Sequence, residues 1–309
     1  MTNIVVLENA HWQVGLVPTS GGSVAYARTR VADAWVDVLR PTPEDALADP
    51  WATGSFPLVP WSNRLTDGRF SWAGRDHQLR INFADGTAIH GTAIEFPWTV
   101  IEQTATSATL EFVSGSFHGV NFPWAFSTRC TYTLDGDRFT WGMELANDDH
   151  ETFPAGLGHH PYFERSLTAD GATVGQPVEL QLNCSMAYPN EGCLPTGPAE
   201  LVEGRLNFTT QRPLGDEFVD DCWTGRTSSV LATLEYPEAL TVDIEAGALF
   251  EHTVVYIPTG ETFFAVEPVT NVNNGFNLEA QGMAGTGVFL LQPGETCSTA
   301  FTLISQPHV

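Results

Sequence analysis

The sequence predicts an all-β protein built as one large antiparallel β-sandwich. Short alternating apolar runs recur about every ten residues, and turns rich in Gly, Pro, Asn and Asp separate them. Many of the runs are rich in Val, Thr, Phe, Tyr and Trp, which favour pleated strands. Helical periodicity is nearly absent, and only residues 42–48 suggest a short helical turn. The predicted strands cover residues 14–18, 23–30, 34–39, 70–73, 98–103, 108–113, 126–134, 138–145, 229–236, 240–245, 253–257, 262–266, 287–291 and 299–304.

The chain length fits one domain that spans residues 1–309. A large all-β sandwich often exceeds 250 residues as a single unit. Hydrophobic residues make up 42% of the 309-residue chain, which supplies a sizeable core. Residues 168–204 are polar and rich in turn signals, but predicted strands continue on both sides of them. We therefore interpret this segment as a long excursion within the domain.

The charge balance limits the classes of partner. Thirteen basic residues face 37 acidic ones, which gives a formal net charge of −24. Such a surface repels phosphate backbones and anionic lipids, so we expect neither a nucleic-acid nor a membrane partner. We also expect no signal peptide, because the N-terminal residues lack a basic segment and a long apolar run. Five cysteines without a CxxC pair are typical of reduced thiols in a cytoplasmic protein.

Four segments concentrate polar, chemically capable residues beside aromatic residues and prolines. Among their residues, Glu267 ends an apolar run and is followed by proline, so we expect it at the end of a buried strand. Burial of a carboxylate there costs free energy unless the group is paired or has a function in a cleft. His160 precedes Pro161, which favours an extended backbone, and a rigidly held histidine can act as a general acid near neutral pH. A turn-capping glutamate and a structural histidine are the alternatives. The segments are 54–70, 88–91, 156–163 and 263–277.

Two further residues in these segments suggest a binding site. Arg64 is one of few basic residues, and its planar fork suits hydroxyls or a carboxylate, although a surface arginine is the usual alternative. His90, which precedes Gly91, is weak evidence alone. No HxH or HExxH spacing supports a metal site formed with Asp220 or Glu267, so none is predicted.

Together and in this order, the motifs resemble the aldose 1-epimerase family, also called galactose mutarotases, over nearly the whole chain. The resemblance implies the family's β-supersandwich, with Glu267 as catalytic base and His160 as catalytic acid; the spacing to Pro161 favours His160 over the adjacent His159. It also implies that a further set of residues binds the sugar. The motifs are Pro18–Gly22, Pro60-x-x-Asn63-Arg64, His90-Gly91, His160–Phe163, Val219–Trp223, Glu267–Thr270 and Asn274-x-Phe276-Asn277; the implied sugar-binding residues are Asn63, Arg64, His90 and either Asp220 or its neighbour Asp221.

The implied chemistry is the interconversion of the α and β anomers of a free hexose. One group removes the proton of the C1 hydroxyl and the other protonates the ring oxygen, from opposite sides of the hemiacetal. No hydride or phosphoryl group moves, so no cofactor is expected. Two alternatives stay open. One is an epimerase for a hexose 6-phosphate or another modified sugar, with Arg69 and Arg75 as additional cations; the other is a carbohydrate-binding protein without turnover. The sequence does not address the oligomeric state.

Overall fold

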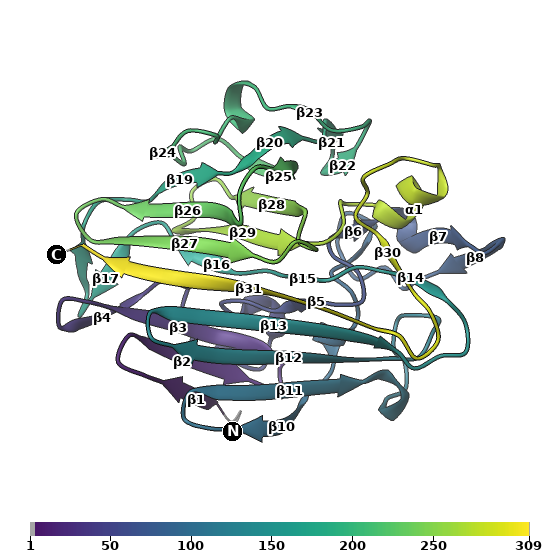
Figure 1. Ribbon diagram of the computed structural model, residues 1–309, viewed down its shortest axis with the longest axis horizontal. Helices are drawn as coiled ribbons and strands as arrows, with labels where there is room; N and C mark the ends of the chain where they lie inside the picture. Colours follow the sequence, from purple (N-terminus) through teal and green to yellow (C-terminus); the bar gives the residue numbers. More distant parts are fainter. Residues whose placement is uncertain (1–3, 309) are drawn as a thin grey trace.

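A computed structural model describes residues 4–308. It is almost entirely antiparallel β-structure, as the sequence predicts, and its largest element is a nine-stranded sheet. The sheet crosses the molecule in the order β10-β11-β12-β13-β31-β27-β26-β19-β24 (Figure 1). Its strands are β10 (Thr99–Gln103), β11 (Ser107–Val113), β12 (Phe126–Asp135), β13 (Arg138–Asn147), β19 (Glu179–Leu182), β24 (Arg212–Pro213), β26 (Val230–Tyr236), β27 (Leu240–Ala246) and β31 (Thr296–Pro307).

Two further sheets pack against the nine-stranded one. The eight-stranded sheet contains β5 (Pro57–Leu58), β15 (Gly158–His159), β16 (Tyr162–Glu164), β20 (Cys184–Ala187), β23 (Glu200–Leu201), β25 (Val219–Arg226), β28 (His252–Ile257) and β29 (Phe263–Val269). The four-stranded sheet contains β1 (Val5–Glu8), β2 (Trp12–Val17), β3 (Ser23–Val31) and β4 (Ala34–Asp37). Ring contacts join the layers: Trp141 of β13 lies 4.5 Å from His159 of β15, and Trp12 of β2 lies 5.8 Å from Phe139 of β13, both between centroids.

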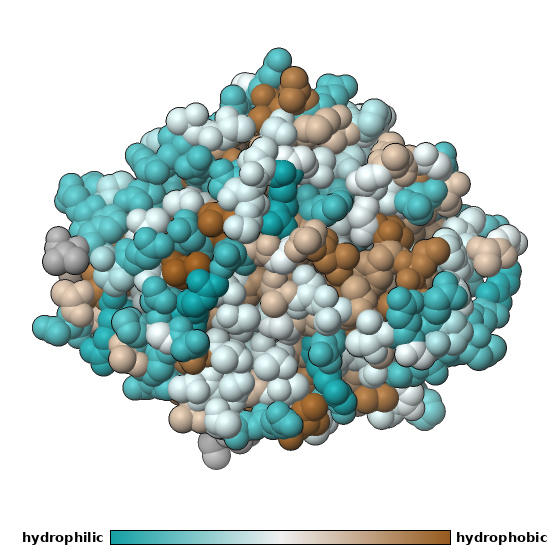
Figure 2. All heavy atoms as spheres, in the orientation of Figure 1, coloured by the Kyte–Doolittle hydropathy of each residue, from teal (hydrophilic) through white to brown (hydrophobic). Residues whose placement is uncertain are grey.

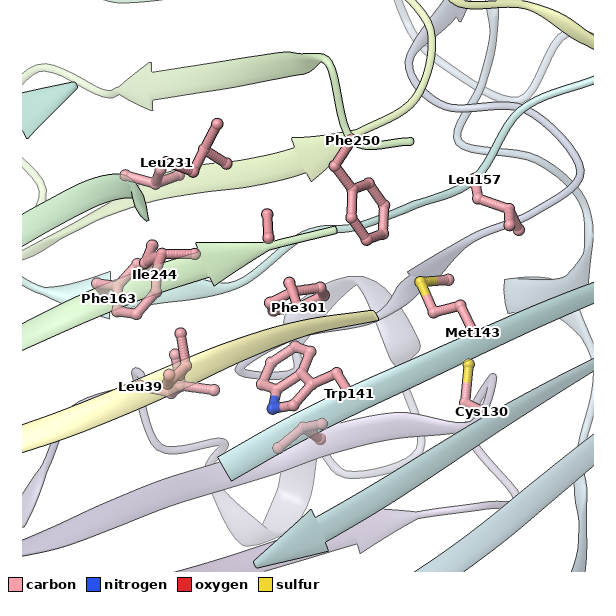
Figure 3. Close-up of a cluster of buried hydrophobic side chains, with 14 of the residues drawn as sticks. Leu39, Cys130, Trp141, Met143, Leu157, Phe163, Leu231, Ile244, Phe250 and Phe301 are labelled. Carbon is pink, nitrogen blue, oxygen red and sulfur yellow. The ribbon is translucent and has the colours of Figure 1, made fainter. Parts of the chain in front are cut away.

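The main hydrophobic core fills the space between these layers. Figure 3 shows part of it, where the ring of Trp141 of β13 lies 4.7 Å from that of Phe301 of β31 between centroids. Burial alternates along the central strands, so apolar side chains face this core and polar ones face outward. Hydrophilic and neutral side chains cover much of the molecular face in Figure 2, and its hydrophobic colour gathers mainly near β14 (Phe153–Ala155) and β30 (Phe289–Leu291).

Short elements complete the described part of the chain. Within the described residues, five two-stranded sheets are β6 (Arg64–Leu65) with β9 (Ala88–Ile89), β7 (Arg69–Trp72) with β8 (Arg75–Gln78), β14 with β30, β17 (Leu167–Ala169) with β18 (Ala172–Val174), and β21 (Asn190–Glu191) with β22 (Leu194–Pro195). The 3₁₀ turns are η1 (Glu44–Ala46), η2 (Pro50–Ala52), η3 (Thr66–Gly68), η4 (Ala93–Glu95), η5 (Ser114–Ser116) and η6 (Gly204–Leu206), and one α-helix, α1, spans Gly275–Ala280.

Every predicted strand overlaps a strand of the structure, and η1 lies inside the predicted helical turn. Two features differ from the prediction. The segment 168–204, where no strand is predicted, supplies β19 to the nine-stranded sheet and β20 and β23 to the eight-stranded one. Helix α1 is unpredicted, since six residues are too short for a helical period to stand out. The N-terminal segment expected to lack a signal peptide begins with residues 1–3, which lie outside the described residues. Within residues 4–308, no helix is long and apolar enough to cross a membrane.

Candidate active site

Strand β29 places Glu267 on the face of the eight-stranded sheet that points away from the main core. Successive side chains of a strand alternate between faces, and Phe264 and Val266 belong to the core. Glu267 therefore projects to the opposite face, where it lies beside β28 in register with Val254. Only 1% of its surface is exposed, so this carboxyl group lies on the floor of a depression.

His160 reaches Glu267 because both segments around it pair with β29. Gly158 of β15 is in register with Val269, and Tyr162 of β16 is in register with Ala265, which brings the intervening histidine beside Glu267. A side chain at Gly158 would collide with Val269, so glycine permits this close strand approach. The Nε2 atom of His160 lies 3.1 Å from Oε1 of Glu267.

This contact corrects one expectation. The two catalytic candidates were expected on opposite sides of a hemiacetal, separated by the width of a sugar ring. They instead lie in direct contact, because the register of β15 and β16 against β29 sets their backbones side by side. The sequence places both residues in one site but holds no information on their separation, since that depends on strand pairing across about one hundred residues.

Burial determines the protonation of this pair. The ring of His160 lies between Phe56 and Tyr162, with centroids 4.9 Å and 4.4 Å away. Its burial, with the cations Arg40 and Arg64 nearby, lowers the pKa of His160 to about 3. Burial and the negative charge of Asp220 raise the pKa of Glu267 well above its ordinary value. Both shifts favour the neutral forms, an unprotonated imidazole at His160 and a protonated carboxyl group at Glu267.

Arg64 and Asp220 form one wall of the depression. Nη1 of Arg64 lies 3.2 Å from Oδ2 of Asp220, and its Nε donates to Asp85 at 2.8 Å. Asn63, in a left-handed conformation with φ of 56°, accepts hydrogen bonds through Oδ1 from the backbone and guanidinium of Arg64. Asn63 lines the cleft as expected, but its side-chain oxygen is already engaged in holding Arg64.

The structure separates the two adjacent aspartates. Asp220 points to the same face as Glu267 and is 8% exposed. Asp221 projects to the other face of β25, where Arg205 lies 2.8 Å away and Asn190 donates to it. Burial raises the pKa of Asp220 although the cation Arg64 opposes that shift. Asp220 is thus the aspartate that faces the cleft.

His90 completes the polar lining, next to the catalytic pair. Its backbone is left-handed, with φ of 61°, and its amide donates to the carbonyl of Asn63. Its ring meets that of His160 edge-on at 5.2 Å. Burial, followed by the neighbouring His160 and Arg64, lowers the pKa of His90 well below its ordinary value, so the ring is neutral. Gly91 must follow it, because a Cβ there would overlap the carbonyl of Val59.

All six predicted site residues line one cleft of about 310 Å³. Sequence reasoning missed the remainder of its lining, which is mainly aromatic. Tyr162 lies inside a recognised motif, and Phe56 and Ile89 lie in two of the segments that the sequence analysis singles out. The other five come from turns and strands with no local polar signal. Those additional residues are Trp51, Phe56, Phe83, Ile89, Tyr162, Cys193, Phe218 and Tyr256.

A cleft with a buried carboxyl–imidazole pair, on a large antiparallel β-sandwich, defines the class of sugar-ring epimerases that the motifs resemble. The family model for aldose 1-epimerase matches residues 4–303, and the chain belongs to this family.

Similar proteins are known from several organisms. The uncharacterized protein YphB of Escherichia coli is 26% identical over 86% of this chain and 88% of its own length. Galactose mutarotase of Mus musculus is 27% identical, but over only 50% of this chain and 44% of its own. A galactose mutarotase-like protein from Clostridium acetobutylicum has a similar structure, with a TM-score of 0.86 at 19% identity over 99% of this chain and 95% of that one. The aldose epimerase homologue of C. elegans gives a TM-score of 0.81 at 13% identity, covering 100% of both chains.

Proposed function

We propose that this protein is an aldose 1-epimerase that interconverts the α and β anomers of a neutral free hexose. The observation that carries the proposal is the direct contact of Glu267 with His160 at the floor of a cleft. Opening a hemiacetal requires one proton to leave the C1 hydroxyl and another to reach the ring oxygen. A pair that holds a single proton can accept one and donate one without changing its total charge.

In the proposed reaction, Glu267 is the base and His160 the acid. The proton that rests on Glu267 in the free cleft moves to His160 before ring opening. The Glu267 carboxylate then takes the hydroxyl proton as the imidazolium gives its proton to the ring oxygen, and the C1–O5 bond breaks to give the open aldehyde. After rotation about C1–C2, the reverse transfers close the other anomer.

The walls are proposed to bind the sugar hydroxyls. Arg64 offers guanidinium N–H donors, Asp220 offers an acceptor, and the neutral ring of His90 has an Nδ1 atom with no hydrogen-bond partner among the described residues. Asn63 acts by orienting Arg64. Groups held in this way by their neighbours need little reorganisation when the sugar binds.

The charges of the cleft favour a neutral sugar over a hexose 6-phosphate. Among the lining residues, Arg64 is the single arginine or lysine, and both Asp85 and Asp220 already pair with it. Arg69 and Arg75 do not line the cleft; Arg75 pairs with Glu151 instead. A phosphate group in the cleft would meet Asp85 and Asp220 without a free cation, which disfavours its binding.

The test is the rate at which a freshly dissolved pure anomer equilibrates. With α-D-glucose or α-D-galactose, polarimetry should show acceleration over buffer, and glucose 6-phosphate should respond less. Replacing Glu267 by Gln should reduce the enzymatic rate by about 10²- to 10⁴-fold, the usual contribution of one general base. Sugar binding measured by calorimetry with no acceleration for any aldose would instead favour a carbohydrate-binding protein.

A further inference from the structure

One arginine outside the cleft lining is bound to the segment that carries His160. The amide of Arg40 donates to the carbonyl of Tyr162 in β16, with 2.8 Å between nitrogen and oxygen. Its Nη2 atom donates to the carbonyls of Ala52 and Thr53, at 3.1 Å and 2.9 Å. Arg40 therefore connects the end of η2 to β16.

The guanidinium group of Arg40 also lies over two aromatic rings. Its central carbon is 4.2 Å from the ring centroid of Tyr162 and 4.4 Å from that of Phe263. These two rings meet each other edge-on at 5.3 Å. No other arginine of the described chain lies over two rings, and none of the ion pairs within residues 4–308 includes Arg40. Because no carboxylate holds this cation, its attraction to the ring faces helps to fix the rings in place.

Tyr162 links Arg40 to the candidate catalytic pair. The ring of Tyr162 lies 4.4 Å from that of His160, at an interplanar angle of 38°. Burial is the main cause of the low pKa of His160, and the charge of Arg40 lowers that pKa further, so the cation lies near the imidazole. Tyr162 lines the cleft and Arg40 does not. An effect of Arg40 on a bound sugar must therefore pass through other residues, and the ring of Tyr162 contacts both Arg40 and His160.

We propose that Arg40 is a positioning residue for His160: its guanidinium group fixes the ring of Tyr162, and that ring holds the imidazole against Glu267. This inference rests on the proposed function, in which His160 delivers a proton to the ring oxygen. Nε2 of His160 lies 3.1 Å from Glu267, but its Nδ1 has no hydrogen-bond partner among the described residues. Packing against neighbouring rings must therefore orient the imidazole, and a misplacement of about 1 Å can cost a reacting group much of its rate.

The alternative is a purely structural role, in which Arg40 only connects η2 to β16 through its bonds to backbone carbonyls. Arg40→Met removes the cation but keeps the length of the side chain. In the positioning role, it should lower kcat for glucose anomerisation by about 10- to 100-fold, because the acid is misplaced. KM should change by less than about 2-fold, because Arg40 does not line the cleft. A kcat within about 2-fold of the wild-type value would overturn the proposal.

Two further variants complete this comparison. Arg40→Lys keeps a cation that can lie over the ring of Tyr162, but it loses the planar fork, so kcat should recover to within about 5-fold of wild type. Arg30→Met is the matched control, because Arg30 lies over the ring of Trp35 at 4.4 Å and neither residue lines the cleft. It should leave kcat and KM unchanged. Equal losses of kcat in Arg40→Lys and Arg40→Met would contradict a role for the cation.

A double-mutant cycle tests whether the effect passes through Tyr162. Tyr162→Leu removes the ring that contacts both Arg40 and His160. In that background, Arg40→Met should lower kcat by less than about 2-fold, because the contact that it disrupts is already absent. Full additivity of the two losses would show that Arg40 acts independently of this ring, and would overturn the proposal.

Phe263 offers a second variant, should Arg40→Met fail to fold. Its ring contacts both Arg40 and Tyr162 but does not line the cleft. Phe263→Leu should loosen the ring of Tyr162 and lower kcat by about 3-fold, the effect of one aromatic contact, with KM unchanged. An unchanged kcat in this variant would contradict the proposal.

NMR measures the orientation of the imidazole without a substrate. The ring signals of His160, identified by their absence from the His160→Gln spectrum, should be narrow in the wild type and displaced by the nearby ring of Tyr162. Arg40→Met should shift and broaden them, and Arg30→Met should not. If the wild type anomerises no aldose, the proposed function fails, and these signals alone decide whether Arg40 holds the ring. If glucose is anomerised but Arg40→Met keeps the wild-type kcat and signals, only the positioning role fails.

Discussion

His159 and His160 are consecutive residues, yet their rings lie on opposite faces of the eight-stranded sheet. The ring of His159 is fully buried in the main core, where Nδ1 lies 2.5 Å from the hydroxyl of Ser55 and Nε2 lies 3.1 Å from that of Tyr132. The ring of His160 contacts Glu267 in the cleft. The alternation of side chains along an extended backbone therefore places one histidine in the core and its neighbour in the cleft.

Substitution of each histidine should separate these two roles. His160→Gln should lower the enzymatic anomerisation rate by about 10²- to 10⁴-fold while the free energy of unfolding stays close to the wild-type value. His159→Leu should instead cost about 1–3 kcal/mol of unfolding free energy, because the buried hydroxyl of Ser55 loses its partner. Urea denaturation and polarimetry measure the two effects. A fully active His160→Gln protein would exclude this histidine as the acid.

Glu267→Gln should change stability in a pH-dependent way. The folded-state pKa of Glu267 lies well above its unfolded value, so the folded protein keeps a proton that the unfolded chain releases above about pH 4.5. The contribution of Glu267 to stability is therefore fully present below that pH and declines as pH rises toward the folded pKa. Glutamine does not titrate, so the variant does not show this decline in unfolding free energy.

The unfolding free energy of Glu267→Gln minus that of the wild type should accordingly increase with pH, by up to about 1.4 kcal/mol per pH unit. Urea denaturation at pH 5, 6, 7 and 8 measures this difference. Glu235→Gln is a suitable control, since Glu235 lies on β26 of the nine-stranded sheet and does not line the cleft. A difference that is constant with pH would mean that Glu267 is ionised in the folded state.

The sequence predicts the sheets better than it predicts the site. The predicted strands and the observed strands agree because alternation of apolar residues is a local property, which a few residues suffice to express. The six site residues come from motifs, and the structure brings all of them to one cleft. The contact of Glu267 with His160 could not be predicted, because it depends on the register of strands that are distant in the chain.

The two exposed phenylalanines that line the cleft could not be predicted from the sequence, for a different reason. Phe83 and Phe218 are two of 19 phenylalanines, and nothing in their local sequence distinguishes an exposed ring from a core ring. Similarly, Asp220 and Asp221 could be separated only when the face of β25 that meets the cleft was known. Motif order thus predicts which two residues meet at the floor of the cleft, whereas the aromatic residues that line it are assembled only by the tertiary structure.

The two aspartates should respond differently to the same substitution. Asp220→Asn removes a charged acceptor from the cleft wall and should weaken sugar binding, with a rise in KM of about 10-fold, as expected for a hydrogen bond that involves a charged group. Asp221→Asn leaves the cleft intact but weakens the pair with Arg205, so it should reduce stability with little change in KM. Initial rates and urea denaturation distinguish them; the reverse pattern would place Asp221 in the site.

Alkylation of Cys193 should block the cleft for substrate. This half-buried residue sits between β21 and β22 with φ of 64°, its carbonyl accepts a hydrogen bond from Asn273 at 2.7 Å, and its side chain lines the cleft. Cys130, Cys184 and Cys222 are buried, so a Cys297→Ser protein offers Cys193 as its accessible thiol. Burial and the carboxylate of Asp220 raise the pKa of Cys193 to about 12, so alkylation should be slow at pH 8 and accelerate as pH increases.

Iodoacetamide should therefore inactivate Cys297→Ser with a rate that increases with pH, and a bound aldose should protect it, because the added carboxamidomethyl group occupies the space of the sugar. Mass spectrometry after proteolysis identifies the modified residue, and polarimetry follows the activity. Cys193→Ala in the same background is the matched control and should resist inactivation. Stoichiometric modification of Cys193 with full retention of activity would show that this thiol lies outside the space that the substrate needs.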